Sequence, residues 1–334
     1  MHPPRSHINL GLSLLVGALA VLSLTVGAAS LPLAAAWHGL VDGDGIAGLI
    51  VREIRLPRTI LALLIGGTFG LAGAALQGLL RNPLAEPALF GAPQAAAAGA
   101  SLMIAFGFAG VTSFAVPLAG IAGALASIGG LLAIAGRRTS LTVTLLAGLA
   151  LASFAGAATA LILNLASNPY IALEIAFWLL GSLEDRSSEH VVLILPFLLP
   201  SWMLLSLCAP AFRALTLGED GAASLGVDIA RTRILVVVGV ALGVGASVAV
   251  TGAVGFVGLV APHLVRRAVG SDPARIMLPA ALAGAALLTA SDIVVRLVPA
   301  ATEIKLGVVT ALIGVPFFLS MILRERKFLE GVPA

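Results

Sequence analysis

Long apolar runs, separated by short polar breaks, extend through almost the whole sequence. Only 10% of the 334 residues are charged and 59% are hydrophobic, whereas a typical soluble domain carries about 25% charged residues. So few charges cannot cover a surface that faces water. We therefore predict an integral membrane protein whose surface lies largely in lipid.

The apolar runs have the length of transmembrane helices, which need roughly 20 residues at 1.5 Å rise each. We predict an all-α membrane protein with about ten spans, forming one domain over residues 1–334. The eighth span is short and rich in glycine, so we expect it to be tilted or buried within protein, and residues 168–188 predict a shorter helix near one membrane face. The predicted spans are 10–31, 58–80, 88–107, 114–136, 141–164, 190–209, 233–251, 253–269, 276–297 and 305–323.

The cations predict the orientation of this chain. Ten spans place both termini on one side, and thirteen of the 19 Lys and Arg residues fall on that side. Loops rich in Lys and Arg stay in the cytoplasm, which predicts that both termini are cytoplasmic. The first apolar stretch is longer than the core of a signal peptide, so we interpret it as an uncleaved span, with a cleaved leader as the alternative.

Glycine patterns suggest close helix packing and a repeat. Gly66 and Gly70, like Gly239 and Gly243, form GxxxG pairs that let helices approach closely in lipid. The second span begins RTILALLIGGTFGLAG and the seventh reads RILVVVGVALGVGAS. Because five spans separate them, they would run in opposite directions, as in two inverted five-helix repeats. Chance similarity between glycine-rich helices is the alternative.

The sequence has no pattern typical of catalysis. The two lysines, Lys305 and Lys327, lack the glycine frame of an ATP-binding P-loop. The five histidines are scattered without metal-ligand spacing, and Cys208 is the single cysteine. We therefore predict a non-catalytic chain without a cofactor or a metal of its own. A net charge of only +3, with the cations in short loops, does not indicate nucleic-acid binding.

Several arginines fall on the predicted outer side, against the charge rule. Arg52, Arg55 and Arg58 precede the second span, and Asp292 and Arg296 lie four residues apart near the outer end of the ninth. A charge inside the bilayer is costly, and i,i+4 pairing would lower that cost. The arginines could receive carboxylates of a partner or anchor the chain to anionic lipid head groups.

Two predicted inner loops could contact partners. The first, residues 82–87, reads NPLAEP, and its two prolines predict a rigid turn. The second, residues 213–233, contains Gly218 and Gly226 around a stretch that begins with Glu219 and Asp220. This pattern predicts a short helix with Ala222, Ala223 and Leu225 available for an apolar contact. A simple connecting turn is the alternative.

These segments together resemble the FecCD-type permeases of ABC importers for iron siderophores, haem and vitamin B12. The matching motifs follow in the family's order from residue 55 onward. They are RLPRTILALLIGG (55–67), GAALQGLLRNPLAEPALFG (73–91), LLAGLAL (145–151), LGEDGAASLGV (217–227), GAVGFVGLVAPHLVR (252–266), LPAALAGAALLTASDIVVR (278–296) and GVVTALIGVPFFL (307–319).

The resemblance implies partners and site residues. It implies a homodimer in the bacterial inner membrane, surrounded by lipid, with two cytoplasmic ATPase subunits that use ATP and Mg, and a periplasmic substrate-binding protein. The implied roles fall on three groups of residues. They are Arg55, Arg58 and Arg296 for docking of the binding protein, Asn82, Leu84, Leu141 and Thr142 for a cytoplasmic gate, and Gly218, Glu219, Ala222, Leu225 and Gly226 for ATPase coupling within the loop 213–233.

Three departures from the family pattern leave the substrate open. Pro93 and Gln94 interrupt a run that is usually small residues, and Lys305 stands where the family tends to have proline. We expect an iron(III)–siderophore chelate because such substrates are frequent in the family, with haem, vitamin B12 or molybdate as alternatives. From another class, an ion-coupled secondary transporter would need a carboxylate within a span, and Asp292 is the one candidate.

Overall fold

The computed structural model describes residues 5–27, 29, 31–43, 45–108, 114–136, 140–299 and 303–329, and every regular element within them is a helix. The short helices η1 and η2 are a π-helix and a 3-10 helix. In chain order the elements are α1 Arg5–Thr25, α2 Leu33–Val41, α3 Gly45–Leu49, η1 Ile50–Arg55, α4 Leu56–Leu80, η2 Pro87–Phe90, α5 Ala92–Ala105, α6 Ala115–Ala135, α7 Leu141–Asn164, α8 Pro169–Leu179, α9 Ser188–Leu207, α10 Ala209–Leu215, α11 Glu219–Ser224, α12 Ile229–Thr251, α13 Val257–Val269, α14 Pro273–Leu297 and α15 Leu306–Leu329.

Eight helices in the described part of the chain are long and apolar enough to cross a membrane. They correspond to eight of the ten predicted spans, and α8 corresponds to the predicted shorter helix. The third and eighth predicted spans are shorter than expected, because α5 has 14 residues and α13 has 13. Left-handed backbone at Gly91 before α5, and at Gly252 and Phe256 before α13, delays the start of each helix.

The core of the bundle is formed by α4 and α12. In the apolar stretches of these two helices 83% and 78% of the residues are buried, whereas in α1 only 6% are buried. Small residues make this packing close. A Cβ added at Gly70 would overlap the Ala280 carbonyl of α14, and one at Gly66 would overlap the carbonyl of Gly284. The predicted GxxxG pair on α4 is therefore a helix contact, as expected where small residues let backbones approach in lipid.

The two halves of the chain pack in a matching way. In the first half α5 is the third of five predicted spans, and α13 is the third of the second half. The helix α4 packs on α13 and α14, while α12 packs on α5 and α6. This exchange of partners is the arrangement that two inverted five-helix repeats would produce.

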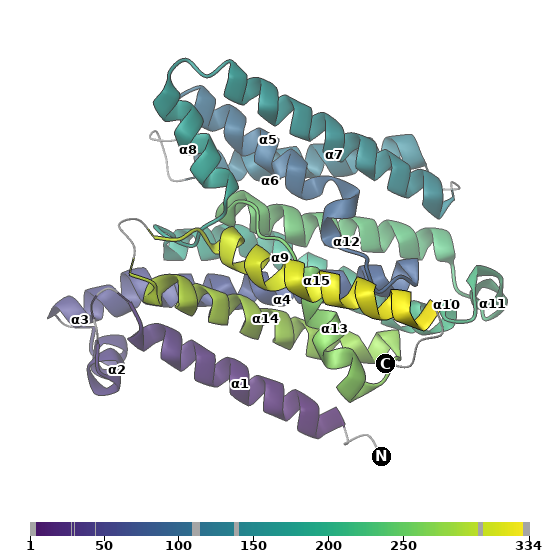
Figure 1. The fold of residues 1–334 in the computed structure, drawn as a ribbon, viewed down its shortest axis with the longest axis horizontal. Helices are drawn as coiled ribbons and strands as arrows, with labels where there is room; N and C mark the ends of the chain where they lie inside the picture. Colours follow the sequence, from purple (N-terminus) through teal and green to yellow (C-terminus); the bar gives the residue numbers. More distant parts are fainter. Residues whose placement is uncertain are drawn as a thin grey trace.

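The bundle has two distinct ends (Figure 1). One, which we call the arginine end, carries α2, α3 and the last turn of α14, and the other, the α11 end, carries α10 and α11. The first turn of α1 and the last turn of α15 both lie at the α11 end. This agrees with the predicted alternation of spans. Six of the cations counted for orientation have side chains outside the described part of the chain, namely Arg5, Arg137, Arg138, Arg324, Arg326 and Lys327.

Candidate functional site

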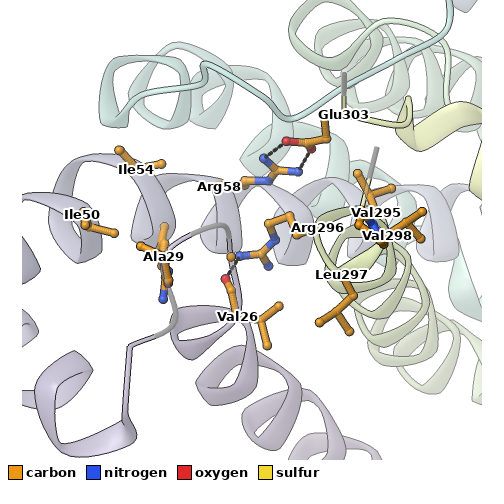
Figure 2. Close-up of a pocket in the computed structure, with 13 residues that line it drawn as sticks. Val26, Ala29, Ile50, Ile54, Arg58, Val295, Arg296, Leu297, Val298 and Glu303 are labelled. Atoms are coloured by element: carbon orange, nitrogen blue, oxygen red, sulfur yellow. Dashed lines mark hydrogen bonds and ion pairs between the residues drawn. The ribbon is translucent and has the colours of Figure 1, made fainter. Parts of the chain in front are cut away.

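Three arginines from distant parts of the sequence meet at the arginine end. Arg55 at the end of η1, Arg58 in the first turn of α4 and Arg296 in the last turn of α14 line one cavity of about 600 Å³, together with Glu303 (Figure 2). Arg55 and Arg58 are only 4% and 7% exposed. The family resemblance groups these three residues, and the structure brings them together in space.

Arg58 is held by two carboxylates. Its Nε donates to Asp292 Oδ1 at 2.8 Å, and its two terminal nitrogens donate to the two oxygens of Glu303 (Figure 2). Asp292 is fully buried, and its Oδ2 pairs with Arg296 Nη2 at 2.9 Å. The predicted i,i+4 pair is therefore confirmed, but it belongs to a larger buried network.

Arg55 and Arg296 also bind the last turn of α1. The final carbonyls of a helix have no partner within the helix and carry its negative dipole end, and α1 has no basic residue of its own in its last turn. The two guanidinium groups supply the missing donors. The carbonyls that accept them at 2.8–2.9 Å are those of Ser23, Leu24, Thr25 and Val26. Sequence reasoning missed this role, because nothing in residues 10–31 marks a partner.

Charge is unbalanced in this cluster. Among the described residues that line the cavity, three arginines face Glu303, and Asp292 is buried beneath them. The excess positive charge is compensated in part by the helix end of α1. Arg52, which the sequence grouped with these arginines, lies apart, since it donates to the carbonyls of Leu40 and Val41 at the end of α2.

The predicted gate residues occupy two places at the α11 end. Asn82 and Leu84 form a tight turn, in which the Leu84 N–H donates to Asn82 Oδ1 at 2.9 Å. Leu141 and Thr142 begin α7. The loop that follows Leu84 contacts α7 further along that helix, at Gly148. A Cβ added at Gly148 would meet Leu89 of η2.

A partly buried carboxylate that the sequence did not single out joins the two irregular loops. Glu86 accepts the Phe256 N–H at 3.2 Å, where the backbone of Phe256 is left-handed. Since α13 then runs roughly 20 Å to its last residue, this contact lies deep in the bundle. The lone acidic residue in NPLAEP was the signal that could have found it.

The coupling segment forms the short helix that its glycines predict. Gly218 (φ 92°) precedes α11 and Gly226 (φ 84°) follows it. Ala222 is fully buried, so its predicted apolar contact is with the bundle itself, where it holds α11 in place. Leu225 is 65% exposed and available. Glu219 is paired with Arg233 at 3.6 Å, which ties α11 to α12.

Within the described residues there is no group of three or more His, Cys, Asp or Glu side chains that could hold a metal ion. The structure instead has a charged cavity at one end of a helical bundle, and the short helix α11 with the exposed Leu225 at the other. Together with the eight long apolar helices that the described residues form, these features define a multi-pass membrane protein. The chain belongs to the FecCD transport family, whose model matches residues 14–324.

Several curated relatives are similar over nearly their whole length. The vitamin B12 import system permease protein BtuC of Salmonella paratyphi A is 36% identical, covering 95% of each chain. The hemin transport system permease protein HmuU of Yersinia pestis is 34% identical, covering 98% of each. An uncharacterised ABC transporter permease protein, YvrB of Bacillus subtilis, is 34% identical over 92% of this chain and 90% of the relative.

A solved structure supports the fold. It is a transporter assigned to the metal-chelate type of ABC transporter, in an inward-facing conformation, with a TM-score of 0.83 and 30% identity over 96% of this chain and 99% of that one. The protein is thus a non-catalytic, multi-pass permease subunit of an ABC importer. Family membership excludes the ion-coupled secondary transporter, and Asp292 forms ion pairs with two arginines.

Proposed function

We propose that two copies of this chain form the passage of a bacterial inner-membrane importer for an iron(III)–siderophore type chelate. A periplasmic binding protein delivers the chelate, and two cytoplasmic ATPase subunits supply the energy through ATP and Mg. Both termini lie in the cytoplasm. The observation that carries this proposal is the arginine-lined cavity, which lies at the opposite end of the bundle from α11.

Docking of the binding protein takes place at Arg55, Arg58 and Arg296. Guanidinium groups bind carboxylates through paired hydrogen bonds, and Arg58 already binds Glu303 in this way. A carboxylate of the partner would therefore take the place of Glu303 or add to it, and the excess positive charge favours either outcome.

Coupling to the ATPase takes place through the loop 213–233. Gly218 and Gly226 delimit α11, Glu219 and Ala222 fix it to the bundle, and Leu225 meets the partner. Movement of α11 then reaches α12 directly along the chain. The matching packing of α4 and α12 supports two inverted repeats as the moving units.

The cytoplasmic gate lies at Asn82, Leu84, Leu141 and Thr142. The rigid turn of residues 82–87 connects this position to Glu86 and hence to the start of α13. Displacement of α13 would therefore be transmitted to the gate through one hydrogen bond and a proline-stiffened loop.

Docking can be tested with a matched pair of substitutions. We expect Arg55→Glu to lower the affinity of the full complex for its binding protein, and increasingly so at low salt, since like charges then face each other. Arg52→Glu is the control, because Arg52 is exposed and lies outside the cavity. Equal effects of the two substitutions would refute docking at this cavity.

Orientation can be tested by labelling in a Cys208→Ala background. Ile46 is 79% exposed near the arginine end and Leu225 is 65% exposed in the coupling loop. A membrane-impermeant maleimide added to spheroplasts should label Ile46→Cys and leave Leu225→Cys unlabelled until the cells are opened. Labelling of both from the outside would overturn the proposed orientation.

The substrate is the finer part of the proposal. The names of the relatives favour haem and vitamin B12 as alternatives, and molybdate is a further one. Ligand-stimulated ATP hydrolysis by the reconstituted complex, with a ferric siderophore, haem, cobalamin and molybdate as the panel, separates them. Stimulation by cobalamin alone, for example, would refute the siderophore.

A further inference from the structure

An apolar groove of about 470 Å³ lies between α4, α9 and α14, away from the arginine cavity. Its walls are mainly small and aliphatic side chains, such as Gly67, Ala281 and Ala285. The Trp202 ring forms part of one wall, and its N–H is satisfied by Thr68 Oγ1 at 2.8 Å, so the ring presents an apolar face. The groove thus offers contacts to an apolar ligand.

The length of the groove matches one leaflet of a bilayer. Along α14 it extends from Ala285 to Ala274, which corresponds to roughly 16 Å at 1.5 Å per residue. Half of a hydrocarbon core is about 15 Å. Because α14 begins at the α11 end, the groove occupies the leaflet on that side.

The width of the groove suits a single hydrocarbon chain. The recess holds about 470 Å³ over a length of roughly 16 Å, which gives room for one acyl chain. A helix of another protein packed over the groove is the alternative occupant, and the variants below separate it from a lipid.

Two exposed cations follow closely in the chain after residues that line one end of the groove. Ala209 and Ala274 line that end, Arg213 follows Ala209 by one helical turn, and Arg275 follows Ala274 directly. The Arg213 and Arg275 side chains are 58% and 50% exposed. Their shared partner is Asp272, at 2.8 Å from Arg213 Nη2 and 3.0 Å from Arg275 Nε.

The cluster remains positive after this pairing. Burial alone would raise the pKa of Asp272, but hydrogen bonds and charge attraction from Arg213, with the backbone N–H groups of Ala274 and Arg275, lower it below its usual value. Asp272 is therefore ionised, and two cations against one anion leave one positive charge. The N-terminus of the 25-residue α14 adds its dipole at the same point.

We propose that this groove binds an anionic phospholipid of the leaflet at the α11 end. One acyl chain lies along α14 between Ala274 and Ala285, and the phosphate lies against Arg213 and Arg275. Basic clusters at the membrane surface attract anionic lipids in this way. The site is separate from the docking cavity, and it shares Arg213 with the loop 213–233 but none of the residues of α11.

Lipid retention by the purified full-length protein tests the head-group contact. The probes are phosphatidylglycerol and phosphatidylcholine with identical acyl chains, measured by native mass spectrometry. We expect Arg213→Ala with Arg275→Ala to lower the retention of phosphatidylglycerol about 30-fold and to leave phosphatidylcholine unchanged, since each cation near the surface contributes about fivefold. The control is Arg231→Ala, an exposed cation at the same end that belongs to α12, a helix that contributes no residue to the groove.

Two further variants keep the proposal testable if the double substitution lowers stability. Asp272→Asn retains a side chain that can cap α14 but removes the negative charge, so it should increase retention of phosphatidylglycerol about fivefold. Ala281→Trp fills the groove and should lower retention of both lipids, whereas Leu14→Trp on the exposed face of α1 should not.

Three results would overturn the proposal. One is equal retention of the two lipids by the unmodified protein, and another is unchanged retention in the Ala281→Trp protein. The third is loss of dimers or of a protein partner in the Ala281→Trp protein without loss of lipid, which would indicate a protein interface at this groove.

Discussion

The two ends of the bundle present their candidate partner sites in opposite ways. At the arginine end the functional side chains are buried and already paired, with Arg58 bound by Asp292 and Glu303. At the α11 end the contact residue Leu225 is apolar and exposed, and it follows a helix of only six residues.

This difference indicates two kinds of recognition. A partner at the arginine end must exchange or join existing ion pairs, so its binding depends on salt and on the internal carboxylates. A partner at the α11 end only needs to bury exposed apolar surface, which depends little on salt. Each prediction below separates these two behaviours.

Loss of the buried carboxylate should have the largest effect. Asp292→Ala leaves Arg296 without its charged partner and Arg58 with only one, so we expect a loss of about 3–5 kcal/mol in the free energy of unfolding. Asp220→Ala, an exposed acidic residue of α11, should change it by less than about 0.5 kcal/mol. Thermal unfolding of the full chain in detergent gives both values. Similar shifts for the two variants would remove the contrast between the ends.

Overpacking at the α11 end should have an intermediate effect. Ala222 is fully buried, so Ala222→Leu should cost about 1–3 kcal/mol in the free energy of unfolding.

Leu225→Asp should instead leave the unfolding temperature unchanged and lower the affinity for the ATPase subunit at least about tenfold, since the contact would lose one buried leucine. Co-purification with the ATPase subunit measures the second effect. An unchanged yield would exclude Leu225 from the contact.

Removing the charge of Glu303, which competes with a partner's carboxylate for Arg58, should strengthen docking of the binding protein. Glu303→Gln weakens the hold on Arg58, so we expect an increase of about threefold to tenfold in affinity for the binding protein, since a charge-assisted hydrogen bond is replaced by a neutral one. Glu53→Gln, an exposed acid in η1 at the same end, is the control. Weaker binding in the Glu303→Gln protein would mean that Glu303 itself contacts the partner.

Much of this architecture was predictable from the sequence, because lipid imposes long apolar runs. The spans, their alternation and the pairing of Asp292 with Arg296 all follow from local spacing. The glycines around α11 likewise predicted where that helix starts and ends.

The remaining features depend on contacts between distant residues, which spacing does not encode. The binding of α1 by Arg55 and Arg296 joins residues more than 25 positions apart, and the pairing of Arg58 with Glu303 joins residues 245 positions apart. The short lengths of α5 and α13 arise because left-handed residues delay their starts, and hydropathy does not detect this. Burial of Ala222 was missed because a six-residue helix has too little periodicity to show which face packs.

The smallest effect is expected at an ion pair of the arginine end that lies outside the cavity. Lys305 Nζ approaches Glu184 Oε2 at 2.9 Å, but the two side chains are 21% and 39% exposed. Solvent screens such pairs, so Lys305→Ala should cost less than about 1 kcal/mol. A double-mutant cycle with Glu184→Ala measures the pair itself. This pair and the Asp292 network lie at the same end of the bundle. If the coupling energy of Lys305 and Glu184 were as large as the effect of Asp292→Ala, location and not burial would set the strength of an ion pair. A small coupling would show that burial, and not location, sets the strength of the ion pairs at this end.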